Sequence, residues 1–158
     1  MKIVINKCHG GFSLSFVAVK ELVKRKKKKV WYYQKIYPKG STSKNFDYSK
    51  WKQKYKQVTK APKDKNDISL IFIVTKNLGP ECTDSALNKA LQKASDVDFF
   101  RYGVRQDPDL VAVVEKLGEK ANGSFADLKV VEIPDGVNWQ IEEYDGLEWI
   151  SEVHQTWS

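Results

Sequence analysis

The sequence predicts an α+β fold, in which a small mixed or antiparallel sheet packs with three or four helices. Three observations predict it. Apolar, β-branched runs indicate strands, apolar residues at i, i+3 and i+4 indicate helices, and the two kinds of segment do not alternate regularly. The chain has 158 residues, of which 41% are apolar. That length supports one hydrophobic core, so we expect a single domain over 1–158.

Three elements are predicted at the start of the chain. The run KIVINK indicates a strand at 2–7. Apolar residues at helical spacing indicate a helix over 15–26, and the cations that follow suit the negative end of its dipole. The aromatic run VWYYQKIY indicates a second strand at 30–37.

A lysine-rich segment at 38–66 follows these elements. It is polar, it is interrupted by proline and glycine, and it shows no apolar pattern that would place it in a core. We therefore expect an insertion or flexible arm, in which the spacing of Trp51 and Tyr55 allows a short helix at 48–57.

The second half is predicted to hold three further strands and three further helices. The strands are expected at 68–75, 128–134 and 137–144, the last two joined by a hairpin turn at Asp135–Gly136. The helices are expected after a Thr83 or Asp84 cap, after an Asp107 cap with Pro108 at the first helical position, and over the C-terminal segment 147–157.

Charge is distributed unevenly along the chain. Residues 1–66 carry 19 Lys and Arg against three acids, which gives +16, whereas residues 67–158 carry 8 against 17, which gives −9; together they make the net +7. Such asymmetry indicates either an anionic partner for the first half or pairing between the halves, within one chain or across a homo-oligomer.

Targeting and redox signals are few. No secretory h-region and no run of about 18 apolar residues is visible, so we expect no membrane partner. Nothing marks a disulfide framework around Cys8 and Cys82, so reduced thiols and a cytoplasmic location are expected.

The stretch INKCHGGFSLS at 5–15 gathers a thiol, an imidazole, two glycines and two serines. Adjacent residues on a strand point to opposite faces, so His9 is poorly placed to activate Cys8. A phosphate-cleaving loop also needs an arginine about six positions after the cysteine, to grip phosphate oxygens bidentately, and Leu14 stands there. We therefore assign no catalytic residue and do not expect an enzyme.

Two interpretations of the glycine turn stay open: a tight strand-to-helix turn with a serine cap, or an anion site built from free backbone N–H groups. Arginines near the Asp107 cap could add bidentate anion recognition, or could pair with the local carboxylates Asp96, Asp98 and Asp107. The candidate anion-binding residues are His9, Gly10, Gly11, Phe12, Ser13, Arg101 and Arg105.

The basic run at 24–29 and the aromatic residues beyond it are typical of a nucleic-acid surface, where cations neutralise phosphates and rings stack on bases. The alternatives are a solvated helix end and an arm that docks on the acidic half. The candidate nucleic-acid-binding residues are Lys24, Arg25, Lys26, Lys27, Trp31, Tyr33 and Trp51.

An acidic group near the C-terminus does not predict a metal site. Glu142 and Glu143 face opposite ways on a strand, so the carboxylates would not converge. His9 and His154, the two histidines, and the two cysteines are too scattered for zinc. We expect no metal and no cofactor.

Two blocks of the chain resemble a group of small bacteriophage and prophage proteins: MKIVINKCHGGFSLS at the front, and the pattern VEIPD…W.IEEYDG.E.I.E.H..W at the back. The resemblance implies a phage accessory protein that acts in the host cytoplasm. By analogy it suggests a non-catalytic oligomer that binds and sequesters a small anionic ligand, such as a nucleotide second messenger of host immunity. The alternatives are a sequence-tolerant nucleic-acid-binding protein that uses 24–56, and an inhibitor that binds a host protein.

Overall fold

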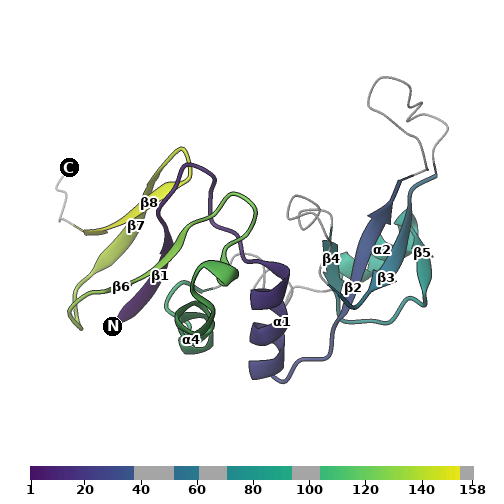
Figure 1. Cartoon of the computed structure of the whole chain (residues 1–158), viewed down its shortest axis with the longest axis horizontal. Coiled ribbons are helices and arrows are strands. Elements are labelled where there is room, and N and C mark those ends of the chain that lie inside the picture. Colours follow the sequence, from purple (N-terminus) through teal and green to yellow (C-terminus); the bar gives the residue numbers. More distant parts are fainter. Residues whose placement is uncertain (38–51, 61–70, 94–103, 154–158) are drawn as a thin grey trace. The chain divides into compact units, whose positions relative to one another are not determined.

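A computed structural model of the chain describes residues 1–37, 52–60, 71–93 and 104–153 (Figure 1). It confirms the predicted α+β class, since helices accompany strands that pair antiparallel throughout. The contacts divide the chain into two compact units, and the single domain over 1–158 stays a prediction. We call Met1–Lys28 with Asp98–Ser158 the terminal unit, and Lys29–Val97 the central unit.

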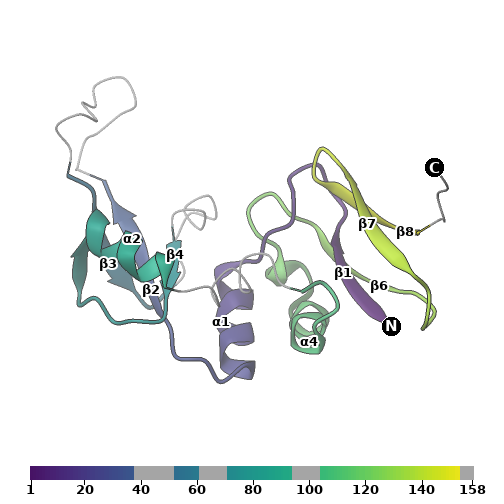
Figure 2. The ribbon, with the colours of Figure 1, turned by 180° about the vertical axis from the view of Figure 1, so that it is seen from behind.

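The terminal unit combines two strand pairs with helices (Figures 1 and 2). Its strands are β1 (Lys2–Asn6), which pairs with β6 (Leu128–Glu132), and β7 (Trp139–Tyr144), which pairs with β8 (Leu147–Glu152). Its helices are α1 (Phe16–Arg25), α4 (Pro108–Leu117) and the 3-10 helix η2 (Gly118–Ala121). α4 packs on α1, β1 and β6, and these elements enclose the core of this unit.

Helix caps form where the sequence predicts them. The Ser15 hydroxyl accepts a hydrogen bond from the Ala18 amide at 3.1 Å and begins α1. The Asp107 carboxylate accepts one from the Asp109 amide at 2.9 Å and begins α4, with Pro108 at the first position, where its fixed φ suits a helix. Each cap lies within a few residues of the amide that it satisfies, so local sequence is enough to locate it.

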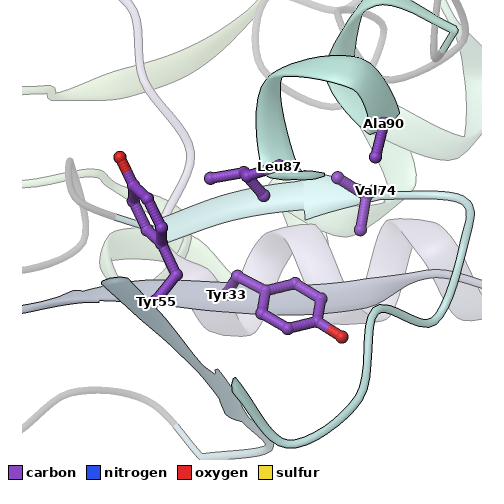
Figure 3. Close-up of a cluster of buried hydrophobic side chains, with 5 residues drawn as sticks. All are labelled: Tyr33, Tyr55, Val74, Leu87 and Ala90. Atoms are coloured by element: carbon purple, nitrogen blue, oxygen red, sulfur yellow. The ribbon is translucent and has the colours of Figure 1, made fainter. Parts of the chain in front are cut away.

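The central unit is a four-stranded antiparallel sheet with a helix against one face (Figure 1). The strand order is β4 (Ile71–Val74), β2 (Trp31–Ile36), β3 (Lys54–Val58), β5 (Glu81–Thr83). α2 (Asp84–Gln92) begins at the predicted Thr83 cap. Its apolar side packs on the sheet in a cluster of five buried residues: Tyr33, Tyr55, Val74, Leu87 and Ala90 (Figure 3).

The predicted C-terminal helix is wrong, because residues 147–152 form strand β8. Asp145 and Gly146 both have positive φ, 50° and 85°, which matches the two-residue turn that twists a hairpin correctly. This turn pairs β8 with β7. Three α-helices are therefore present among the described residues, fewer than the four in the predicted order.

The predicted hairpin at Asp135–Gly136 is also wrong, since β6 pairs with β1 and not with β7. The predicted helix at 48–57 is replaced by β3, whose Tyr55 is buried while Lys54 and Lys56 are exposed. That alternation has the period of a strand. Part of the expected arm is thus built into a sheet, and the rest, 38–51 and 61–66, lies outside the described residues.

Candidate functional site

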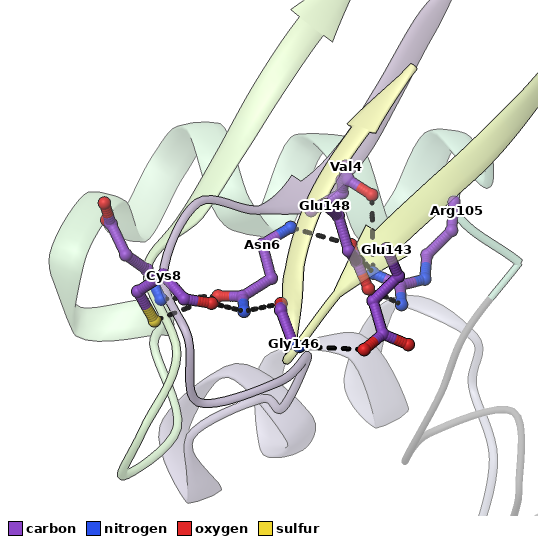
Figure 4. A network of polar contacts seen from close by, with 8 residues as sticks. Val4, Asn6, Cys8, Arg105, Glu143, Gly146 and Glu148 are labelled. Carbon is purple, nitrogen blue, oxygen red and sulfur yellow. Dashed lines mark hydrogen bonds and ion pairs between the residues drawn. The ribbon is translucent and has the colours of Figure 1, made fainter. Parts of the chain in front are cut away.

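The stretch that follows β1, residues 7–13, is the front loop, and a buried asparagine anchors it (Figure 4). The side-chain nitrogen of Asn6, Nδ2, donates to the carbonyl oxygens of Cys8 at 2.7 Å and Gly146 at 2.6 Å. Its side-chain oxygen accepts from the Asp127 amide at 2.8 Å. The Cys8 thiol donates to the Phe125 carbonyl at 3.0 Å. The front loop is therefore tied at once to the β7–β8 turn and to the segment before β6.

Close backbone approach explains two glycines of this junction. A Cβ on Gly10 would lie 1.7 Å from the Phe125 carbonyl oxygen, and a Cβ on Gly146 would lie 2.4 Å from the Gly11 nitrogen. Neither space can hold a side chain, so glycine is required for packing. The packing interpretation of the glycine turn thus has direct structural support.

Arg105 belongs to the same junction, but a carboxylate of the protein already occupies its guanidinium. One guanidinium nitrogen donates to Glu148 Oε1 at 2.8 Å and the other to Oε2 at 3.2 Å (Figure 4). Burial lowers the pKa of Arg105, and Glu148 opposes that shift. The guanidinium also lies 3.3 Å from the centroid of the Phe12 ring, as a cation–π contact. Among the described residues, the partner of Arg105 is therefore Glu148 and not Asp107, whereas Asp96 and Asp98 lie outside the described residues.

The structure brings together most of the predicted anion-binding residues that it describes. Phe12 and Arg105 touch, Gly10 packs against Phe125 and Gly11 against Gly146, and His9 is exposed. No hydrogen bond of the Ser13 side chain is found in the described part of the chain, and its carbonyl accepts from Gly123. Arg101 lies outside the described residues. Because the Arg105 guanidinium is bound by Glu148 and lies against the Phe12 ring, the main role of this cluster is to hold the fold together.

The basic run after α1 is partly paired as well. Lys26 Nζ lies 2.8 Å from the carboxylates of both Asp107 and Asp109, and Arg25 lies 3.8 Å from Asp109. The hydrogen bonds that the Lys26 ammonium donates to these carboxylates, Asp107 first, raise the pKa of Lys26. Lys24 and Lys27 are exposed. Two of the four cations predicted to bind nucleic acid therefore hold the end of α1 to the start of α4.

The predicted aromatic platform is mostly interior. Tyr33 is fully buried, and its hydroxyl donates to the Gly79 carbonyl at 2.9 Å. Trp31 is half-buried, with Lys29 5.4 Å from its ring centroid. Trp51 lies outside the described residues. Among the described rings of the central unit, Tyr37 is the large exposed one.

Lysines of the central unit form a different kind of surface. Lys54 and Lys56 project from β3 on the face opposite Tyr55, and therefore away from the face that α2 covers. Lys52, just before the strand, is exposed as well. We call these three residues the lysine row. Lys56 is opposite Glu81 in the register with β5, yet no ion pair joins them among the described residues.

Eight described lysines of the central unit form no ion pair with any carboxylate that the structure describes: Lys29, Lys52, Lys54, Lys56, Lys60, Lys76, Lys89 and Lys93. All eight are exposed. The sequence indicated a surplus of lysine, but only the structure separates paired from unpaired cations.

Neither a metal centre nor a membrane span is found in the part of the chain that the structure describes. No three His, Cys, Asp or Glu side chains are grouped there so as to hold a metal ion. No described helix is long and apolar enough to cross a membrane. No family model, no curated protein and no solved structure matches this chain. The resemblance to phage and prophage proteins therefore stays a prediction.

Proposed function

We propose that the central unit binds single-stranded nucleic acid through its phosphates, without sequence preference. The observation that carries this proposal is the set of eight exposed lysines that lack a carboxylate partner among the described residues. Residues 29–97 hold 14 lysines and no arginine against six acids, which gives +8, more than the whole net charge of the chain. Unpaired surface cations attract polyanions because binding releases the counterions of the phosphates.

The placement of the lysine row supports a polymer over a single small anion. Lys54 and Lys56 are two residues apart on one strand, which separates them by about 6.8 Å. Successive phosphates of an extended single strand are spaced on a similar scale. A small anion needs donors that converge on one point, and these lysines are instead spread along a line.

The front loop supports a small ligand less well. An anion at Arg105 would have to displace Glu148, a buried carboxylate that already binds the guanidinium bidentately. Sequestration of a nucleotide second messenger therefore stays a prediction from the resemblance. Lysine contacts to phosphates carry no sequence information, so the proposed binding is tolerant of base composition.

The test is the affinity for a labelled oligothymidylate, measured by fluorescence anisotropy over a range of salt concentrations. The variant Lys52→Gln/Lys54→Gln/Lys56→Gln removes the lysine row. The plot of log affinity against log salt is expected to lose about 0.7 in slope per phosphate contact, hence about 2 in all.

The matched control, Lys2→Gln/Lys116→Gln/Lys129→Gln, removes the same charge from lysines that pair with carboxylates in the terminal unit. Its salt slope is expected to remain that of the unchanged protein. Equal losses in both variants, or no binding of the oligonucleotide, would overturn the proposal. A thermal shift with one class of mononucleotide, in the absence of oligonucleotide binding, would favour the small-ligand hypothesis instead.

A further inference from the structure

The β7–β8 hairpin carries the opposite kind of surface. Residues 130–158 contain seven acids and no Lys or Arg. Glu148 is used internally by Arg105. The remaining hairpin carboxylates form no ion pair with a cation among the described residues: Glu142, Glu143, Asp145 and Glu152. By strand alternation, Glu142 lies on the face of the hairpin that carries Tyr144 and Trp149, whereas Glu143 and Glu152 lie on the opposite face and Asp145 lies in the turn. We call Glu142, Asp145, Tyr144 and Trp149 the hairpin surface.

Two aromatic rings accompany these carboxylates. Tyr144 is 71% exposed and Trp149 is 39% exposed. In the register of the hairpin, Trp149 is opposite Glu142, so the two side chains share a face. Hydrogen bonds, first from Ser151 and then from Gln140, hold the pKa of Glu142 below its ordinary value. This face therefore presents fixed negative charge beside exposed rings.

We infer that the hairpin surface of one molecule docks on the lysine row of a second copy of this chain, and that docking and nucleic-acid binding exclude each other. The unpaired carboxylates on the terminal unit are opposite in charge to the unpaired lysines on the central unit, so the two surfaces are electrostatically complementary. On the lysine row, the carboxylates would pair with the ammonium groups in place of phosphates, and the exposed rings would pack in place of bases. The second half of this inference, the exclusion, rests on the proposed function.

A second copy is the occupant that the charges favour, because every chain carries both surfaces. Such a contact is head-to-tail, because it joins two different surfaces. The degree of self-association therefore increases with protein concentration. Tyr144 and Trp149 belong to the residue types that most often anchor protein interfaces. Docking of the hairpin on the lysine row of its own chain would instead be independent of concentration.

The first experiment is sedimentation velocity of the full chain without nucleic acid, over a range of protein concentrations. The average sedimentation coefficient is expected to rise with concentration at about 50 mM salt and to fall to that of the monomer at about 500 mM, where surface charges are screened. A coefficient that does not change with concentration overturns the inference.

The variant Glu142→Gln/Asp145→Asn removes two charges from the hairpin surface and keeps an acceptor oxygen for the Ser151 hydroxyl that binds Glu142. Self-association is expected to weaken about fivefold, the size of two modest surface ion pairs. The control, Glu119→Gln/Glu132→Gln, removes two exposed charges elsewhere in the terminal unit and is expected to leave association unchanged. Equal weakening by both variants also overturns the inference.

The second experiment adds oligothymidylate to the associated protein, which is expected to dissociate into nucleic-acid-bound monomers. If the strand binds dilute protein but leaves the assembly intact, the exclusion is overturned and the proposed function stands. If no strand binds while association depends on Glu142 and Asp145, the proposed function fails, the exclusion fails with it, and the docking stands.

Discussion

The two units of this chain use their cations in opposite ways. In the terminal unit, 13 Lys and Arg meet 14 acids, and ion pairs join α1 to α4, β1 to α4 and the start of α4 to β8. In the central unit, 14 lysines meet six acids, and tyrosine and aliphatic packing forms the core. Matched cations hold elements together, whereas surplus cations repel one another and remain available to a partner.

The pair most sensitive to disruption is Arg105–Glu148. The variant Glu148→Ala is expected to lower the free energy of unfolding by about 3 kcal/mol, because it leaves a partly buried guanidinium and the backbone amide of Asn6 without their acceptor. Urea denaturation measures the change. Glu152→Ala, exposed on the same strand, is the control and is expected to cost little. A loss below about 1 kcal/mol for Glu148→Ala would contradict the claim that matched charges hold the terminal unit together.

A smaller, pH-dependent effect is expected at Asp107. Burial raises the pKa of Asp107, but hydrogen bonds from Lys26 and from the first amides of α4 together lower it by more, so this pKa lies below the ordinary value. A depressed pKa stabilises the fold above the unfolded pKa of about 3.9, and that stability is lost as the pH falls through the folded pKa.

Asp107→Asn keeps the cap and removes the charge. It is expected to cost about 1 kcal/mol at neutral pH, from the lost ion pair and helix-dipole interaction. The difference from the unchanged protein should vanish in acid, below the folded pKa of Asp107. Thermal unfolding at several pH values measures it. A difference that persists unchanged in acid would show that the carboxylate charge contributes nothing.

The smallest effect is expected from the lysine row. Lys52→Gln/Lys54→Gln/Lys56→Gln should change the free energy of unfolding by no more than about 0.5 kcal/mol per site, with a sign toward stabilisation as repulsion is relieved. The same urea denaturation measures it. A loss of several kcal/mol would mean that these lysines support the fold, and it would remove the contrast between the units.

Local signals made much of the fold predictable. The Thr83 and Asp107 caps and the apolar spacing after each located α2 and α4. Strand β8 was not predictable in the same way, because Leu147 and Ile150 have the i, i+3 spacing of a helix. Only the pairing with β7 makes this segment a strand. For β3, the two apolar residues of KYKQV, Tyr55 and Val58, are three positions apart and do not alternate, so they are a weak strand signal until β2 and β5 flank the segment.

The candidate sites divide in the same manner. The sequence brought attention to Arg105 and to the front loop, but the acceptor of that arginine lies 43 residues further along the chain. Local spacing favoured nearby aspartates, and one of these, Asp107, binds Lys26 instead. Long-range pairing of charges depends on which elements pack together, and no short window contains that information.

By itself, the sequence determined the helix caps and the excess of lysine in the first half. Each depends on groups within a few residues of one another, or on composition alone. The tertiary structure alone decided that Arg105 is neutralised, that Tyr33 is core, and that the lysine row is exposed without carboxylate partners among the described residues. The sequence sets the number of charged side chains, but whether each of them can bind an external partner depends on which residues the fold places beside it.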